Sequence, residues 1–331
     1  MTTSVAMCTY NGAQFIEEQL RSILDQTIPV GEVVVCDDCS TDETISIIEK
    51  IAKETTIPIH IYVNETNLGC VRNFEKAIRL CQGDIIFLSD QDDVWMSNKV
   101  EAITQWFDQH PTMNVVFGDA ILVDNMGIPI MKSQVQNAPP PHKKGQDEPV
   151  MLWEDIGFTR LSKEQFKMGL SLELWIVQNR ATGATMAFRN EFAENIQIVY
   201  PKYYHDFALS FNGILVDTLG FIDKPLIYYR QHTEQATGCS LKFPIPQGWD
   251  DARVINKYEL DFSAFKIDKK TKDRIDFVQQ RYFIQYSVIR MAHWKNWPKY
   301  KYLYGKNGLY MFTYDICKSI KYTIKHILKK K

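Results

Sequence analysis

Short apolar runs alternate with segments of helical periodicity through the first third of the chain. The runs are residues 4–8 (SVAMC), 32–36 (EVVVC), 59–63 (IHIYV) and 84–88 (DIIFL). Repeated strand–helix units predict an α/β fold, in which a mostly parallel sheet carries helices on both faces. Because ligands bind beyond the carboxyl ends of such strands, the residues after Cys8, Cys36 and Leu88 are the first candidates for a functional site.

Apolar residues three or four positions apart define the helices between these runs. They are Phe15, Ile16, Leu20, Ile23 and Leu24, then Ile45, Ile48 and Ile51, then Val71, Phe74, Ile78 and Cys81. Ser40 and Glu43 have the spacing of a capping box for the second helix. A further helix is expected from about Ser97, and Pro111 ends it.

The rest of the chain has a weaker pattern. The expected elements are strands at residues 114–123 and 184–188, a polar proline-rich loop at 134–149, and a helix at 164–178. Beyond about residue 240 the pattern becomes mixed and then helical. We therefore expect one domain at residues 1–240 and a mainly helical, basic C-terminal extension at residues 241–331.

Charge and hydropathy exclude several classes of function. The net charge of −2 gives no basic field for nucleic acid. No apolar stretch approaches the ~18 residues that cross a bilayer, and no signal-peptide pattern begins the chain. We expect a cytoplasmic protein. The lysine- and aromatic-rich residues 295–331 fit peripheral contact with a membrane surface, or a helix packed on the first domain.

The seven cysteines are scattered, which argues against a disulfide framework. Cys36 and Cys39 form a C-x-x-C, which fits a redox pair, half a zinc site, or simply a strand end and a turn. Asp37 and Asp38 between them oppose thiolate formation, and no second C-x-x-C completes a zinc site. The strand end and turn are therefore favoured.

Three carboxylates follow the fourth apolar run: Asp90, Asp92 and Asp93. In an extended segment residues two apart point the same way, so Asp90 and Asp92 can converge on one cation. Like charges this close repel unless a positive group lies among them, and a hard divalent ion meets that need. The competing interpretation is a solvated loop before a helix, whose N-terminus favours acids.

Residues 83–95 (GDIIFLSDQDDVW) resemble the D-x-D region of family 2 glycosyltransferases, closest to bacterial rhamnosyltransferase-like members. The resemblance implies Mg²⁺ or Mn²⁺ held against the donor diphosphate. Asp90 would lie near the ribose and the metal, Gln91 at the nucleotide sugar, Asp92 on the metal, and Asp93 behind them. A Lewis acid there would stabilise the negative charge that builds on the leaving diphosphate.

Residues 8–11 (CTYN) resemble a nucleotide-contacting segment of the same family. The resemblance implies that Thr9, Tyr10 and Asn11 contact the donor, with a ring face of Tyr10 offered to the base. A partly buried core tyrosine is the alternative for Tyr10.

Residues 37–42 (DDCSTD) resemble the second such segment. Asp37 would lie at the donor, and Asp38 would accept the imide N–H of uracil or thymine, which suits an ionised carboxylate. A turn with a helix cap is the alternative. Arg72, in residues 67–73 (NLGCVRN), stands where the family has an arginine near the donor phosphates, although it also fits a surface arginine.

His205 and Asp206 precede an apolar stretch and resemble the position of the family's general base. Asp206 would take the proton of the acceptor hydroxyl as that oxygen attacks the anomeric carbon. An ordinary pKa of about 4 would leave it ionised at neutral pH. A helix N-cap is the alternative. Gly183, in residues 180–188 (RATGATMAF), and His205 are implied to lie on the acceptor side.

Residues 225–238 (PLIYYRQHTEQATG) resemble the family's Y-R-x-H segment. His232 would supply a neutral imidazole nitrogen to the metal, although a lone histidine is more often structural or exposed. Two positions depart from the family pattern: Cys39 stands where glycine is usual, and Gln235 stands near a common asparagine. These two departures leave open the detailed structure of the turn at Cys39 and of the loop after His232. They do not change the resemblance to the family.

The ordered motifs span residues 3–240 and imply the GT-A fold. Family members invert the anomeric carbon by a single displacement. The resemblance implies transfer from a nucleotide-sugar donor, dTDP-rhamnose or a UDP-sugar, to a hydroxyl of a glycan or lipid-linked glycan in cell-surface polysaccharide synthesis.

Two other functions stay open on sequence alone. A non-catalytic adaptor would keep the fold and bind nucleotide or glycan, although the intact Asp90, Asp92, Asp206 and His232 argue against it. A nucleotidyltransferase usually has a glycine-rich, basic N-terminal loop for a triphosphate, which residues 8–21 lack.

Overall fold

The computed structural model describes residues 1–131, 181–199, 204–233, 267, 269 and 271–273. The chain divides into two compact units, Met1–Pro246 and Gln247–Lys331, and nearly all described residues belong to the first. The expectations for residues 134–149, 164–178 and 295–331, and for Gln235, lie outside the described residues. The domain boundary near residue 240 and the helical extension therefore stay predictions.

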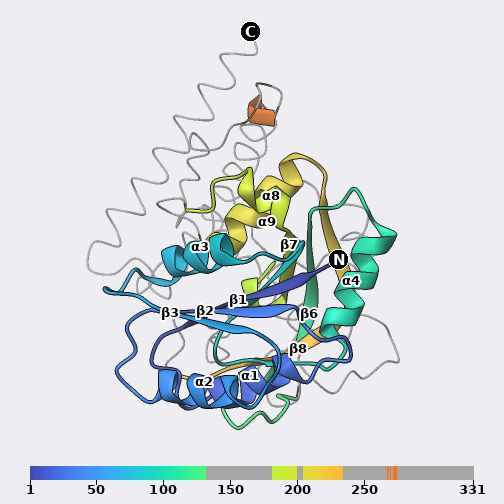
Figure 1. Cartoon of the computed structure of the whole chain (residues 1–331). Helices are drawn as coiled ribbons and strands as arrows, with labels where there is room; N and C mark the ends of the chain where they lie inside the picture. The colour runs from blue at the N-terminus through green and yellow to red at the C-terminus, as the bar shows by residue number, and fades with distance from the viewer. Residues whose placement is uncertain (132–180, 200–203, 234–266, 268, 270, 274–331) are drawn as a thin grey trace, which may run out of the picture. The chain divides into compact units, whose positions relative to one another are not determined.

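The described part of the first unit is built on one eight-stranded sheet (Figure 1). In spatial order the strands are β3 (Ile59–Val63), β2 (Glu32–Asp37), β1 (Thr3–Thr9), β4 (Ile85–Ser89), β7 (Met186–Arg189), β6 (Val115–Val123), β8 (Leu219–Arg230) and β5 (Val94–Trp95). The pairs β1–β2, β1–β4, β2–β3 and β6–β8 are parallel. β7 and β5 run antiparallel to their neighbours. The predicted, mostly parallel sheet is confirmed.

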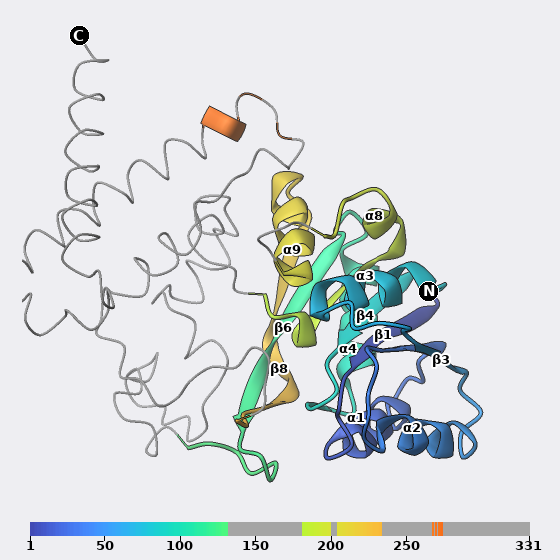
Figure 2. The same cartoon turned by 90° about the vertical axis from the view of Figure 1, so that its left-hand side faces the viewer.

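Helices cover both faces of this sheet, as predicted. α1 (Ile16–Leu24) and α2 (Thr44–Ala52) lie together on one face, and α3 (Cys70–Leu80) lies on the other (Figures 1 and 2). α4 (Lys99–Gln109) contacts β8, the short α8 (Asn190–Glu194) follows β7, and α9 (His205–Leu215) contacts α3. None of the described helices is long and apolar enough to cross a membrane.

β4 shows why the central strands have continuous apolar sequences. All five of its residues are buried, because helices cover both faces of the sheet. Phe87 packs on Trp95 with ring centroids 5.6 Å apart, and apolar residues of α1, α2 and α4 complete the same core. Burial of each such side chain stabilises the folded state by about 1.5–3 kcal/mol. This core holds in place the strand ends that form the site.

The N-terminus of α2 differs from the prediction. The helix begins at Thr44, and Ser40 donates to Asp37 from both its N–H and its hydroxyl. Asp42 accepts the N–H and the hydroxyl of Thr44. The capping-box prediction was wrong, because Asp37 accepts the N–H of Ser40 that Glu43 would have accepted, and the helix begins only at Thr44.

The strand expected at residues 184–188 is β7, but it begins two residues later. Gly183–Thr185 form a 3-10 turn, η2, in which the N–H and the hydroxyl of Thr185 both donate to the carbonyl of Thr182. This turn brings Gly183 to the start of α9.

Candidate active site

The loops that follow β1 and β4 meet where the strand order of the sheet reverses. The side-chain amide of Gln91 accepts the N–H of Tyr10 at 2.8 Å and donates to its carbonyl at 3.0 Å. A Cβ atom at Gly12 would overlap the amide of Gln91, so this approach requires glycine. Gln91 therefore joins two loops that the sequence assigned to the donor.

Asp37, at the end of β2, organises the adjacent turn. Its Oδ2 accepts the hydroxyls of Thr9 and Ser40 at 2.6 and 2.5 Å, and its Oδ1 accepts the N–H of Ser40 at 2.7 Å. Asn11, with φ of +48°, accepts the N–H of Thr41 at 2.8 Å and donates its own N–H to Ser40 Oγ at 2.8 Å. The structure thus brings the predicted Thr9, Asn11 and Asp37 into one hydrogen-bonded turn.

The carboxylate of Asp38 is 4% exposed and accepts three N–H groups. The side chain of Asn64 and the N–H of Leu68 donate to Oδ1 at 2.8 and 2.7 Å, and the N–H of Gly69 donates to Oδ2 at 2.8 Å. Asn64 also donates to Asn73 Oδ1 at 2.8 Å. A carboxylate accepts about four hydrogen bonds, so Asp38 holds the loop before α3 and keeps capacity for one more donor.

Tyr10 and Arg72 lie at the protein surface, near the loops that follow β1 and β2. Tyr10 is 50% exposed, which excludes the core-tyrosine alternative. Arg72 is exposed in the first turn of α3. Both side chains are accessible to a ligand, as their predicted roles require.

Asp92 and His232 come together from distant parts of the chain. Nε2 of His232 lies 2.9 Å from Oδ2 of Asp92. Asp92 follows β4 and His232 follows β8, while the ring of Phe15 packs on His232 with centroids 4.8 Å apart. The two motifs predicted to supply metal ligands therefore meet in space.

Two buried basic side chains flank the acidic loop, which is the segment after β4 that holds Asp90, Asp92 and Asp93. Nζ of Lys99 is fully buried and donates to the carbonyl of Ala184 at 2.8 Å. Burial lowers the pKa of Lys99, whereas the charges of Asp93 and Asp90 raise it. Arg230, 1% exposed at the end of β8, donates its backbone N–H to Asp93 Oδ1 at 3.0 Å. Each cation thus contacts or faces the acidic loop from the protein interior.

Asp90, Asp92 and Asp93 still outnumber these two cations. Burial, and then the charges of Asp92 and Asp206, raise the pKa of Asp90 to about 7. Burial, and then Asp92 and Asp90, raise the pKa of Asp93. Asp93 Oδ2 is buried without a hydrogen-bond partner in the part of the chain that the structure describes. Surplus negative charge and an unpaired buried oxygen both favour a bound cation.

These residues fit a divalent ion that also binds the donor diphosphate. Adjacent ligands of an octahedral ion, each about 2.1 Å from it, lie about 3 Å apart, and Asp92 Oδ2 and His232 Nε2 are 2.9 Å apart. Among the described residues, no group of three or more His, Cys, Asp or Glu could hold a metal alone.

Asp206 lies in the first turn of α9, after the N-cap residue Tyr204, which excludes the N-cap alternative. The N–H of Phe207 donates to its carboxylate at 2.6 Å, and the N–H of Gly183 also hydrogen-bonds to it. Burial raises the pKa of Asp206 to about 6, and these bonds partly offset the rise. The expected ordinary pKa was wrong, because the carboxylate is desolvated.

His205, beside Asp206, is buried, and neither ring nitrogen has a hydrogen-bond partner among the described residues. Its ring stacks on Phe74 with centroids 3.9 Å apart. A Cβ atom at Gly183 would lie 3.0 Å from Nε2 of His205, so glycine makes room for the ring. Burial lowers the pKa of His205 to about 3. The neutral imidazole therefore offers one donor and one acceptor.

Three carboxylates from different predicted motifs raise the pKa of one thiol, that of Cys70 at the start of α3. Burial, and then the charges of Asp90, Asp206 and Asp38, raise the pKa of Cys70 to about 12. Asp90, Asp206 and Asp38 therefore lie close enough to Cys70 for their charges to act on it.

The C-x-x-C forms a strand end and a turn. All five described cysteines are free, and Cys36 is buried in β2. Cys39 has φ of +68° and donates from Sγ to the carbonyl of Asn64 at 3.0 Å. Cys39 thus adopts the left-handed conformation that favours the glycine usual at this position.

Lys99, Arg230 and Asn73 were missed as site residues. Lys99 shares the buried face of α4 with Ile103, and a lysine on an apolar helix face signals a buried cation. Asn73 lies on the buried face of α3 in the same way. Arg230 was noted only for its spacing from His232, since no local pattern reveals its partners.

Comparisons with known proteins identify the family of this chain. The sequence profile of Glycosyl transferase family 2 matches residues 4–160. An uncharacterized glycosyltransferase of Haemophilus influenzae is 33% identical over 310 residues, which cover 88% of this chain and 89% of that protein. The putative teichuronic acid biosynthesis glycosyltransferase TuaG of Bacillus subtilis is 37% identical over 98 residues, 30% of this chain and 38% of TuaG. The dTDP-rhamnosyl transferase RfbG of Shigella flexneri is 37% identical over 99 residues, 29% of this chain and 34% of RfbG. The matches to TuaG and RfbG thus span less than half of those proteins.

Two solved structures share the fold. Staphylococcus aureus TarS 1–349 in complex with UDP has a TM-score of 0.53 and 20% identity, over 86% of this chain and 71% of that one. The mannosyltransferase PcManGT of Pyrobaculum calidifontis, in complex with GDP-Man and Mn²⁺, has a TM-score of 0.52 and 16% identity. The match covers 100% of this chain and 88% of that one.

The sheet and its structural neighbours define the GT-A fold. The chain belongs to glycosyltransferase family 2.

Proposed function

We propose that this enzyme transfers a sugar from a nucleoside diphosphate to a hydroxyl of a glycan or lipid-linked glycan, with inversion, in cell-surface polysaccharide synthesis. The observation that carries the proposal is the meeting of Asp92 and His232 at the strand ends, 2.9 Å apart, while the charges of Asp92 and Asp206 both act on Asp90. The name of TuaG, a putative teichuronic acid biosynthesis glycosyltransferase, supports this class of pathway, and that of RfbG, a dTDP-rhamnosyl transferase, supports a nucleotide-sugar donor.

The donor would be dTDP-rhamnose or a UDP-sugar. Asp38 keeps capacity for one further N–H donor, which suits the imide of uracil or thymine, and Tyr10 offers an exposed ring for the base. Thr9, Asn11 and Asp37 would shape the turn around the nucleotide. Gln91 would hold that turn against the acidic loop.

Asp92 and His232 would hold Mg²⁺ or Mn²⁺ with the donor phosphates, and Arg72 would approach the same phosphates through paired hydrogen bonds. Asp90 would lie near the ribose and the metal. When bound, the ion would act as a Lewis acid toward the leaving diphosphate. The Mn²⁺ in the PcManGT structure supports the use of a divalent ion.

Asp206 would act as the general base. Its carboxylate takes the acceptor's hydroxyl proton while that oxygen bonds to the anomeric carbon and the bond to the diphosphate breaks. The pKa of about 6 keeps it ionised at neutral pH yet basic enough to accept the proton. His205 and Gly183 would lie on the acceptor side, where the buried imidazole stacks on Phe74 beside Asp206.

Residues 295–331 would give peripheral contact with the cytoplasmic face of a membrane, where a lipid-linked acceptor lies. Binding of the full chain to anionic vesicles tests this part separately, because it does not depend on the donor site.

The first experiment is thermal stabilisation by a panel of nucleoside diphosphates and nucleotide sugars, with and without Mn²⁺. A ligand that binds only the folded state raises the unfolding midpoint by mass action. We expect a metal-dependent rise with UDP or dTDP and a smaller one with GDP or CDP. A stabilising donor without transfer to any acceptor would favour the adaptor, and pyrophosphate release from a nucleoside triphosphate would favour a nucleotidyltransferase.

A further inference from the structure

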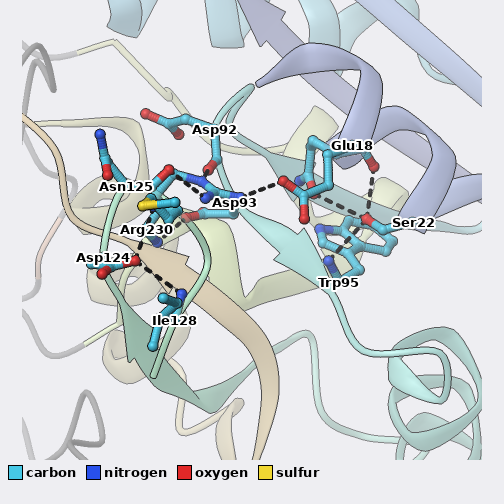
Figure 3. A network of polar contacts seen from close by, with 11 residues as sticks. Glu18, Ser22, Asp92, Asp93, Trp95, Asp124, Asn125, Ile128 and Arg230 are labelled. Carbon is cyan, nitrogen blue, oxygen red and sulfur yellow. Dashed lines mark hydrogen bonds and ion pairs between the residues drawn. The ribbon is translucent and has the colours of Figure 1, made fainter. Parts of the chain in front are cut away.

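Arg230 is a buried arginine whose guanidinium donates hydrogen bonds to acceptors on three other residues. Nε donates to the carbonyl of Asp92 at 2.8 Å, and Nη1 donates to the carbonyl of Asn125 at 2.9 Å. Nη2 pairs with Oε2 of Glu18 at 2.6 Å. Figure 3 shows the guanidinium between the acidic loop and α1, with these partners around it.

The same residue is tied to both sides of the candidate metal site. Its backbone N–H donates to Asp93 Oδ1 at 3.0 Å, so it contacts the acidic loop twice. His232 follows it by two residues at the end of β8. The ring of Phe15 lies 4.8 Å from the guanidinium carbon and 4.8 Å from the His232 ring centroid.

We propose that Arg230 is a positioning residue that sets Asp92 against His232 before the metal and the donor arrive. The inference rests on the proposed metal-dependent function and adds a role for a residue that need not touch either ligand. The carbonyl of Asp92 is fixed by Nε, and the segment with His232 is fixed because it continues from Arg230. Both ligands are therefore located by one side chain.

The geometry requires a guanidinium rather than an ammonium. Three nitrogens in a rigid plane reach acceptors on three separate segments, and the plane also packs on an aromatic ring. Lysine keeps the charge but cannot reproduce that fork. Arg230→Lys should therefore preserve the electrostatic balance of the loop and lose its alignment.

The test compares Arg230→Lys with a chemically matched control, Arg189→Lys. Arg189 also donates to two carbonyls, those of Met113 and Phe107, and its guanidinium carbon lies 5.1 Å from the Phe107 ring centroid. It lies in β7 and makes none of these contacts with the acidic loop. Mn²⁺ binding is followed by electron paramagnetic resonance of the free ion, alone and with UDP, beside the thermal midpoint without metal.

We expect Arg230→Lys to weaken Mn²⁺ binding by about 10- to 100-fold, the usual effect of losing a residue that orients metal ligands. Arg189→Lys should lower the thermal midpoint similarly and leave the Mn²⁺ affinity within about twofold of wild type. Half-saturating Mn²⁺ for transfer should rise in Arg230→Lys, while kcat at saturating metal and donor changes less.

Unchanged Mn²⁺ affinity in Arg230→Lys, or equal weakening in Arg189→Lys, overturns the positioning role while the proposed function stands. If wild-type protein binds no Mn²⁺ with UDP, the metal-dependent function fails and the inference fails with it. If Arg230→Lys does not fold, Phe15→Leu replaces it, since this change removes the ring shared by Arg230 and His232. It should also weaken Mn²⁺ binding, and unchanged affinity there counts against the role.

Discussion

The two edges of the candidate active site differ in how their polar groups are satisfied. At the nucleotide edge, formed by the loops after β1 and β2, Asp37 and Asp38 each accept three hydrogen bonds. At the reaction edge, formed by the acidic loop and the start of α9, Asp93 Oδ2 and both nitrogens of His205 are buried without partners among the described residues. The pKa values of Asp90 and Asp206 are raised there to about 7 and about 6.

The difference separates a preorganised surface from an incomplete one. A buried network with most of its hydrogen bonds made holds one conformation, because each lost bond leaves an unpaired polar group. The reaction edge instead has surplus charge and unpaired atoms that a cation, a diphosphate and an acceptor would satisfy. Substitutions at the nucleotide edge should therefore cost stability, whereas substitutions at the reaction edge should cost transfer.

The largest effect is expected for Asp206→Asn. The amide cannot accept the acceptor's proton, so transfer should fall by at least about 10²-fold, the usual scale for loss of a general base. Donor binding should change little, because the variant keeps the shape of the side chain. Steady-state transfer and donor-induced thermal shifts measure the two quantities.

Asp217→Asn is the matched control for that variant. Asp217 is exposed just after α9, so the change removes the same charge from a site without a proposed role. It should leave transfer within about twofold of wild type, as is usual for surface substitutions. Near-normal transfer by Asp206→Asn would remove Asp206 from the mechanism and with it the assignment of the reaction edge.

The next effect is on stability at the nucleotide edge. Asn73 accepts from Asn64 and donates to the carbonyl of Cys36, both at 2.8 Å. Asn73→Ala leaves buried groups unpaired at about 1–3 kcal/mol each, so we expect a loss of about 2 kcal/mol or more in the free energy of unfolding. Chemical denaturation measures it. Asn98→Ala serves as the control, because Asn98 is exposed and its side chain makes no capping bond. Equal losses of unfolding free energy in Asn73→Ala and Asn98→Ala would contradict a stabilising role for the hydrogen bonds at the nucleotide edge.

The nucleotide edge was also the more predictable of the two. Strands buried on both faces keep continuous apolar runs, so their ends, and Thr9, Asp37 and Asp38 on them, could be placed from sequence. The capping box failed because Asp37 accepts the N–H of Ser40 and Asp42 accepts the N–H of Thr44. Such competition between short polar side chains is not decided by spacing alone.

The reaction edge depends on contacts between distant residues. Arg230 meets Glu18 across 212 positions, and Lys99 meets Ala184 across 85. No local pattern encodes either pair. The raised pKa of Asp206 likewise follows from burial in the folded chain, so sequence supplied the residue but not its acidity.

A smaller effect is the dependence of kcat on pH. Asp206 must be ionised to accept a proton, and burial raises its pKa to about 6. With saturating donor and metal, kcat should be level above about pH 7 and fall roughly tenfold per pH unit below about pH 6. An apparent pKa near 4 would mean that the carboxylate is solvated, and it would remove the electrostatic difference between the two edges. Circular dichroism over the same range excludes unfolding as the cause.

The smallest effect, and the one that most directly separates the edges, is a stabilising substitution at the reaction edge. The pKa of Asp90 is raised to about 7 in the folded chain, so its ionisation disfavours the folded state progressively as pH rises from about 4 to about 7. In EDTA at pH 8, Asp90→Asn should raise the unfolding midpoint by about 2 °C or more, given about 2–4 °C per kcal/mol for large domains. The gain should vanish below about pH 4, where the wild-type carboxyl becomes protonated in both states. It should reverse with Mn²⁺ and UDP, because the wild type then gains the ligand that its surplus charge favours. A lower midpoint in EDTA would show that Asp90 is satisfied without ligand, like Asp37 and Asp38, and the contrast between the two edges would not hold.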